Sequence, residues 1–200
     1  MAYFINTVEI EARNRNIQES KIKKWKDSLP DSLISFINQD RFNDALLSNG
    51  LLNSNYWHDA IELDNEKANH KWNNMVTIID TLLNGALKNE ITPGLVFIPC
   101  RFLYDSSSYN SNNPWVLSGC NVKREWLVKR TEIQKRLSDW TASKDIPFLD
   151  LTPVFRKQSL QSKELFNHKL DGHWNEVGHE IAAKAIQSWI KNQNLFYIKD

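Results

Sequence analysis

The spacing of apolar side chains predicts three long helices. The clearest lies over residues 65–88, where apolar residues recur at three- and four-residue spacing and therefore line one face of a helix. Its members are Ala68, Trp72, Met75, Val76, Ile79, Leu82, Leu83 and Ala86. Similar stripes predict helices over about 121–143 and 175–191. Each stripe is expected to pack against a core.

Two short apolar runs, Leu95–Ile98 and Ile146–Leu151, predict strands. Because these runs do not alternate with polar residues, they are typical of strands buried on both faces of a parallel sheet. Residues 2–10 alternate between apolar and polar side chains and include β-branched residues, which predicts a further strand. Residues 195–198 fit a short edge strand.

The remaining segments predict shorter elements. Helices are expected over about 16–28, 31–37 and 41–47. Residues 51–64 read as irregular, and residues 100–120 as a polar loop. Thr152 precedes a proline, which predicts a helix start with the Thr152 hydroxyl as its cap.

This order of elements predicts one α/β domain over residues 1–200. Strand, helices, strand, helix, strand, helix is typical of a parallel sheet with helices on both faces. The expected fold is therefore a flavodoxin-like three-layer α/β/α arrangement. In such sheets the active site lies at the carboxyl ends of the strands.

Composition narrows the function classes. The 25 basic and 24 acidic residues leave a net charge of +1, so no nucleic-acid partner is expected. No apolar run approaches ~18 residues, so no membrane span is expected, and the first six residues lack the features of a signal peptide. The six glycines form no dinucleotide or nucleotide-phosphate motif and no G-x-S-x-G elbow. Cys100 and Cys120 fit either a disulfide or two buried thiols.

The candidate chemistry lies in the loop before the last helix. Residues two apart in an extended loop point to the same side, so Asp171 and His173 can face one pocket together. A carboxylate that orients an imidazole is half of a nucleophilic triad. The alternative is that Asp171 and Asn175 cap the helix while His173 packs nearby. Asn175 is the expected helix cap and Gly178 a site of close helix packing.

Residues 147–153 and 170–182, with D-G-H-W-N-E-V-G-H at their centre, resemble the last conserved block of the SGNH (GDSL-like) hydrolases. The closest form is the D-x-H type of bacterial cell-envelope esterases and sugar O-acetyltransferases. Residues 95–104 are similar to the preceding strand and loop, so the resemblance covers roughly residues 67–190. It implies that His173 is the general base and Asp171 its orienting partner. His179 lies on the following predicted helix, where a structural role is expected over a catalytic one.

The chain departs from the family pattern at the nucleophile. It contains no G-D-S block and no G-x-N-D block. Asn6 is the expected relic of the oxyanion-binding Asn, in which case the chain starts at the family's third strand and the serine strand is lost or lies upstream. Within the chain, the substitutes for the nucleophile are Ser106, Ser107 and Ser108, which also fit an ordinary polar loop.

The expected function is that of an SGNH-type serine ester hydrolase or O-acyltransferase acting on acylated carbohydrate or other small esters, without a cofactor. The resemblance implies a cell-envelope or secreted location, and the isolated chain is expected to be inactive or weak. The alternative is a non-catalytic carbohydrate-binding or assembly module that uses Trp115, Trp174 and Tyr109. Metal-dependent hydrolysis through Asp171, His173 and His179 is disfavoured, because their spacing matches no helical ligand pair.

Overall fold

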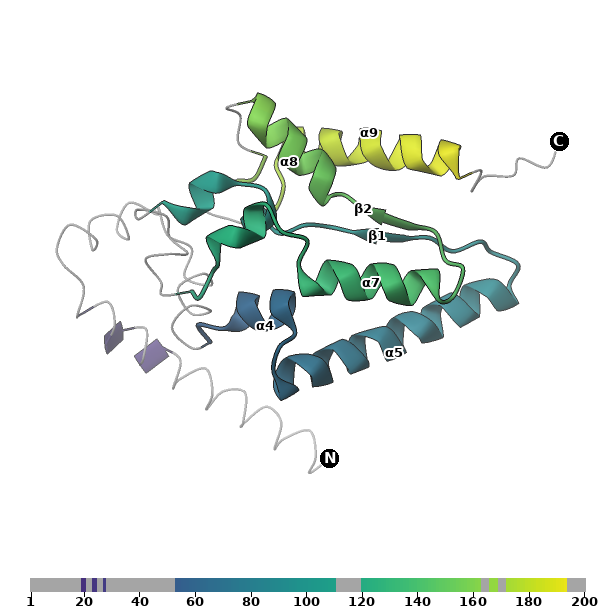
Figure 1. Ribbon diagram of the computed structural model, residues 1–200, viewed down its shortest axis with the longest axis horizontal. Helices are drawn as coiled ribbons and strands as arrows, with labels where there is room; N and C mark the ends of the chain where they lie inside the picture. The colour runs from purple at the N-terminus through teal and green to yellow at the C-terminus, as the bar shows by residue number, and fades with distance from the viewer. Residues whose placement is uncertain are drawn as a thin grey trace. The chain divides into compact units, whose positions relative to one another are not determined.

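The computed structural model describes residues 53–110, 120–162, 166–168 and 172–193, with 19–20, 23–24 and 27 (Figure 1). The chain divides into two compact units, Met1–Tyr56 with Ser111–Asn121 and Trp57–Asn110 with Val122–Asp200. Residues 19–20 and 23–24 are helical, within the helix predicted over 16–28. The strand predicted over 2–10, the helices over 31–37 and 41–47, and the strand over 195–198 lie outside the described residues.

In the second unit, two strands form a parallel pair. Strand β1 (Leu95–Phe97) aligns with β2 (Phe148–Asp150), so that Val96 lies opposite Leu149. Both strands were predicted, although each is shorter than its apolar run. Helix α7 (Glu132–Ala142) lies on the connection between them, as parallel pairing requires. The described part of the chain is a helix-dominated α/β structure with this small parallel sheet.

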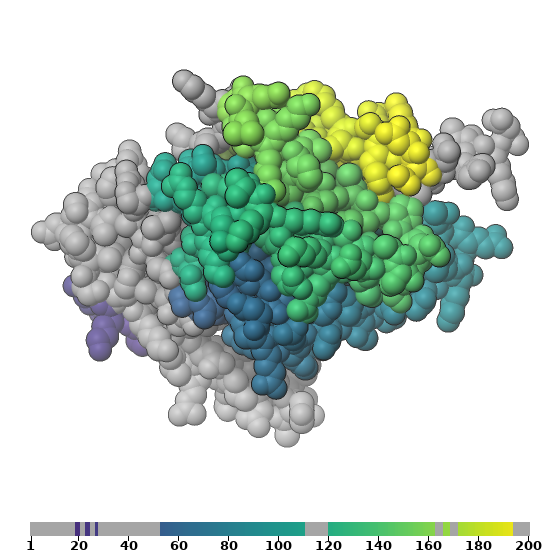
Figure 2. Space-filling view, in the orientation of Figure 1, coloured from purple at the N-terminus to yellow at the C-terminus, as the bar shows by residue number. Residues whose placement is uncertain are grey.

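Helices pack on both faces of the strand pair (Figure 1). Val96 and Leu149 point toward α8 (Thr152–Gln161) and α9 (Glu176–Asn192), which lie side by side at the surface in Figure 2. We call this group the α8–α9 cluster; its buried members are Tyr104, Leu151, Phe155, Phe166 and Ala182.

The neighbouring strand residues point the opposite way, because side chains alternate along a strand. Leu95, Phe97 and Phe148 pack toward α7 and the long helix α5 (Glu66–Lys88). We call this group the α5–α7 cluster; its buried members are Leu63, Ala68, Ile133 and Leu137. The continuous apolar run in each strand therefore contributes side chains to both the α8–α9 cluster and the α5–α7 cluster.

Helix α5 agrees with its predicted bounds and starts at Asn65, whose side chain accepts a hydrogen bond from the Ala68 amide at 2.9 Å. One member of its stripe differs from the prediction, since Leu82 is 68% exposed, and the neighbouring Ile78 is 64% exposed. The apolar arc of the helix is wider than the surface that the two described strands offer.

Two predicted segments were wrong. Residues 51–64 contain a helix, α4 (Tyr56–Glu62), where irregular chain was expected. The helix predicted over 121–143 is instead a short 3₁₀ helix, η3 (Arg124–Leu127), followed by α7. The break falls at Thr131, where Gln134 accepts a hydrogen bond from the Thr131 amide at 2.9 Å and thereby starts a new helix.

The start of α8 also differs in its cap. The Thr152 hydroxyl was expected to cap the helix, but the Asp150 carboxylate accepts the Thr152 amide at 2.8 Å. The Thr152 hydroxyl instead accepts a hydrogen bond from the buried Gln134 side chain at 3.0 Å, and Gln134 also donates to Asp150 at 2.7 Å. This network joins the end of β2 to the first turns of α7 and α8. The T-x-x-Q spacing at Thr131 is the sequence signal that marks it.

Candidate functional site

His173 lies on a short antiparallel pairing between residues 166–168 and 172–175, which we call the His173 hairpin. Asn167 pairs with Trp174 across it. The His168 amide donates to the His173 carbonyl at 3.1 Å, and the Asn175 amide donates to the Phe166 carbonyl at 3.0 Å. Asp171, the predicted partner of His173, lies outside the described residues, as does Asn6.

The two faces of the His173 hairpin differ in exposure. Asn167 is 4% exposed, and Trp174 packs against the α8–α9 cluster. His168 and His173, the next pair along the hairpin, are exposed. Because successive side chains of an extended segment alternate, the imidazole of His173 lies on the solvent side. It is therefore within reach of a small-molecule substrate.

The inner face of the hairpin is bonded to the segment that follows β1. The Tyr104 hydroxyl donates to Asn167 Oδ1 at 2.5 Å, and Asn167 Nδ2 donates to the Gly172 carbonyl at 2.8 Å. Burial raises the pKa of Tyr104, although its hydrogen bonds with Trp174 and Asn167 and the charge of Arg101 oppose this. Tyr104 therefore remains a neutral hydrogen-bond donor. No local sequence pattern marks this contact, whose partners are 63 residues apart.

The start of α9 follows the hairpin directly and agrees with the prediction. The Asn175 side chain accepts the Gly178 amide at 3.0 Å and so caps the helix. A Cβ at Gly178 would collide with the Phe166 carbonyl oxygen and would lie 2.9 Å from the Trp174 Cβ, which confirms the predicted close packing. His179 is exposed, and its ring lies nearly perpendicular to the Trp174 ring, with the two ring centroids 5.9 Å apart.

The serines proposed as substitute nucleophiles lie in the 3₁₀ helix η2 (Ser106–Tyr109), beside a carboxylate. The Ser107 hydroxyl donates to Asp105 at 2.6 Å. The Ser108 hydroxyl is fully buried, donates to Asp105 at 3.1 Å and accepts from Arg101 Nε at 2.7 Å. Ser106 is exposed.

Asp105 is a weak base toward these hydroxyls. Burial acts to raise its pKa, but hydrogen bonds from Ser107 and the charge of Arg101, whose Nη2 lies 2.7 Å from the carboxylate, lower the pKa below its ordinary value. A carboxylate of lowered pKa takes up a proton less readily. The hydrogen bonds of Ser107 and Ser108 to Asp105 and Arg101 are thus those of a structural network.

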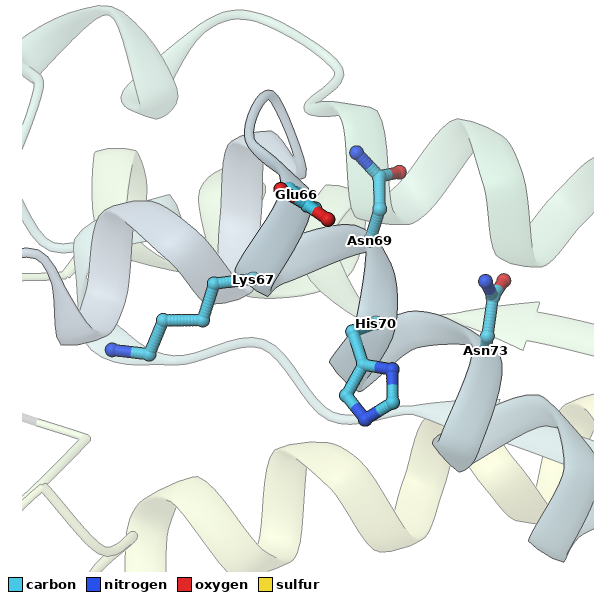
Figure 3. Close-up of a pocket in the computed structure, with 5 residues that line it drawn as sticks. All are labelled: Glu66, Lys67, Asn69, His70 and Asn73. Atoms are coloured by element: carbon cyan, nitrogen blue, oxygen red, sulfur yellow. The ribbon is translucent and has the colours of Figure 1, made fainter.

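A shallow pocket lies on α5, lined by Glu66, Lys67, Asn69, His70 and Asn73 (Figure 3). All five side chains come from the first turns of one helix, and they point away from it in different directions. Since α5 packs on the sheet face opposite α8 and α9, this pocket is separate from the His173 hairpin.

The aromatic residues proposed for sugar binding are engaged in packing. The Trp174 ring stacks on Phe155 with centroids 4.6 Å apart. The Tyr109 hydroxyl lies 2.8 Å from the carbonyl oxygens of Phe102 and Lys123. Trp115 lies outside the described residues.

Metal-binding groups and reactive thiols are two further kinds of site that the described part of the chain could hold. Among those residues, no group of three or more His, Cys, Asp or Glu side chains is arranged to hold a metal ion. Cys100 and Cys120 are both reduced thiols, and burial raises the pKa of Cys100 to about 12. A thiol with this pKa is protonated at neutral pH and is a poor nucleophile.

Across the described ranges, none of the helices has the length and apolar content needed to cross a membrane. Comparisons of the chain with protein-family models, with curated proteins and with solved structures find no match.

Proposed function

We propose that the chain is the C-terminal part of an SGNH-type serine ester hydrolase or O-acyltransferase that acts on acylated carbohydrate or other small esters. In this proposal β1 and β2 belong to a larger, flavodoxin-like three-layer α/β/α domain. His173 is the general base and Asp171 orients it.

One observation carries the proposal: an exposed His173 sits on a hairpin that is hydrogen-bonded to the segment following a parallel strand. Tyr104, which makes the bond, follows the carboxyl end of β1, and open parallel sheets bind their ligands outside these strand ends. The loop also continues directly into α9, as the resemblance implies.

In the proposed reaction, a serine hydroxyl attacks the ester carbonyl while His173 accepts its proton. The tetrahedral intermediate then expels the alcohol, which takes the proton back from His173, and an acyl-serine remains. Water or an acceptor hydroxyl repeats these steps on the acyl-serine. Asn6 is proposed to donate to the oxyanion.

Two sources of the nucleophilic serine are compatible with the proposal, one within the chain and one outside it. Ser107 and Ser108 hydrogen-bond to Asp105, which leaves the exposed Ser106 as the internal candidate that these contacts do not engage. A serine in a G-D-S block outside these 200 residues is the alternative that the resemblance favours. The isolated chain is therefore proposed to turn over esters slowly.

The test compares p-nitrophenyl acetate hydrolysis by the chain and by His173→Gln. Loss of a general base typically costs about 10²–10⁴-fold in rate, so the slow turnover is expected to fall to the background rate. The matched control is His179→Gln, an exposed histidine on the adjoining helix, which is expected to retain the turnover. Turnover above the background rate that is equal in all three proteins would contradict the proposal.

The alternative, a carbohydrate-binding or assembly module, has less support. One face of the Trp174 ring is covered by Phe155, so that face is closed to a sugar ring. Glycan binding unchanged by His173→Ala, in a protein without esterase activity, would favour this module over the enzyme.

A further inference from the structure

We propose that Asn167, held in place by Tyr104, is a positioning residue that sets the direction of the His173 side chain. The inference rests on the proposed function, in which His173 is the general base. It assigns a role to two buried side chains on the inner face of the hairpin, the amide of Asn167 and the phenol of Tyr104.

The first step of the argument concerns the peptide group before His173. Asn167 Nδ2 donates to the Gly172 carbonyl at 2.8 Å. This carbonyl belongs to the same planar unit as the His173 amide, because the peptide bond is rigid. The side chain of Asn167 therefore fixes the plane that precedes the Cα of His173.

The second step concerns the peptide group after His173. The His173 carbonyl accepts the His168 amide at 3.1 Å, within the pairing that Asn167 and Trp174 form. With both flanking peptide planes held, the backbone dihedrals of His173 are restricted, and so is its Cα–Cβ direction. Only the side-chain torsions remain for a carboxylate to select.

The third step concerns the orientation of the Asn167 amide. Tyr104 donates to Oδ1, and Gly172 can only accept from Nδ2, so the two partners allow one of the two amide orientations. Both Asn167 and Tyr104 are at most 4% exposed. Buried away from water, each would be costly to leave without its partner, and the pair therefore holds together.

We call the hydrogen bonds from Tyr104 to Asn167 and from Asn167 to Gly172 the clamp. This role also explains why two polar side chains are buried beneath the hairpin. An apolar pair would fill the same volume of the α8–α9 cluster without the cost of burying an amide and a phenol. The polar pair instead joins the hairpin by a hydrogen bond to the segment that follows β1, and so fixes the position of the hairpin relative to the sheet. A general base must be held within a few tenths of an ångström of its working position, so this tie has a direct use.

The test measures the imidazole tautomer of His173 by long-range ¹H–¹⁵N NMR at a pH where the ring is neutral. A positioned carboxylate selects one tautomer, whereas a loosely held ring exchanges between two. The chain is expected to show one predominant tautomer. Tyr104→Phe removes the hydrogen bonds of Tyr104 with Asn167 and Trp174, and Asn167→Asp removes the donor to the Gly172 carbonyl. Each variant is expected to give a mixture of tautomers, together with His168 amide exchange at least about tenfold faster.

Tyr109→Phe is the matched control. It removes a phenol hydroxyl that hydrogen-bonds to the backbone carbonyls of Phe102 and Lys123, which lie outside the hairpin. It is therefore expected to leave the His173 tautomer unchanged. If Asn167→Asp does not fold, Tyr104→Phe decides alone, since it deletes one oxygen and keeps the ring.

The outcomes separate the two proposals. A mixed tautomer in the unchanged chain would mean that no carboxylate orients His173, and the proposed function would fail. A single tautomer that survives both Tyr104→Phe and Asn167→Asp would overturn the positioning role alone. A single tautomer that is lost in the clamp variants but kept in Tyr109→Phe is the expected result.

Discussion

At the scale of single residues, two helical glycines differ in their surroundings. Gly85 in α5 has no atom within 4 Å of the place where a Cβ would stand. Gly178 in α9 faces the Phe166 carbonyl and the Trp174 side chain, which belong to the His173 hairpin. The same substitution therefore tests helix propensity at one position and close packing at the other.

We expect Gly85→Ala to raise the free energy of unfolding by about 0.8–1 kcal/mol, the difference in helix propensity between the two residues. Gly178→Ala is expected to lower it by about 1–3 kcal/mol, because backbone and hairpin must move to admit the methyl group. Urea unfolding of both variants measures the two values. A stabilising Gly178→Ala would show that the helix is not held against the hairpin.

Asp105 gives a prediction for the dependence of stability on pH. Its pKa is lower in the folded protein than its ordinary value of 3.8, because the hydrogen bonds of Ser107 and the charge of Arg101 outweigh burial. The unfolded chain then binds the proton more readily, so the stabilisation is fully present above about pH 4 and is lost as the pH falls through the folded pKa.

We therefore expect Asp105→Asn to be less stable than the parent chain at pH 7 and to lose less stability on acidification. Urea unfolding from pH 3 to pH 7 gives both curves, and their difference is the contribution of Asp105. Asp139→Asn, on the helix α7, serves as the carboxylate control. Parallel curves for Asp105→Asn and the parent would refute the assigned shift.

At the scale of elements, one side chain of α8 joins two 3₁₀ helices. Arg156 Nε donates to the Leu103 carbonyl at 2.9 Å, and its Nη2 donates to the Trp126 and Lys129 carbonyls at 2.7 Å each. The carbonyls at the ends of η1 (Arg101–Leu103) and η3 thus find partners that their own short helices cannot supply. The planar guanidinium reaches them together.

Arg156→Lys is expected to lower the free energy of unfolding by about 1–3 kcal/mol, since a single ammonium cannot serve the same set of partly buried carbonyls. The neighbouring Lys157 is exposed, and the reverse change Lys157→Arg is expected to stay within about 0.5 kcal/mol of the parent. Urea unfolding compares the two. Equal effects would mean that the three carbonyls are satisfied without Arg156.

At the scale of the second unit, two apolar clusters lie on opposite faces of the strand pair. Phe155 and Phe166 belong to the α8–α9 cluster, with ring centroids 6.1 Å apart, whereas Leu137 belongs to the α5–α7 cluster. The strands separate the two groups, so their members share no direct contact in this arrangement.

Double-mutant cycles test this separation. Phe155→Leu with Phe166→Leu is expected to show a coupling free energy of about 0.5–1.5 kcal/mol, because the two rings touch. Phe155→Leu with Leu137→Ala is expected to be additive within about 0.5 kcal/mol. Urea unfolding of the single and double variants provides both cycles. Strong coupling in the second pair would show that the clusters are one core.

Much of the local structure could be predicted because it depends on neighbours within a turn or two. The three- and four-residue spacing located α5, and Asn175 and Gly178 were recognised as the cap and the close contact of α9. The same reasoning failed over 121–143, where a continuous apolar stripe hid the helix start at Thr131. Periodicity reports which face is apolar, but it does not report where a helix is interrupted.

The sequence by itself determined helix α5, the two strands and their parallel type, and the position of His173 before the last helix, because each depends on side chains close together along the chain. Only the tertiary structure decided that Tyr104 holds Asn167 and that Arg156 donates to the carbonyls of two other elements. Such contacts form between buried polar groups that folding brings together. Burial makes each group require a partner, and the path of the chain decides which partner is near.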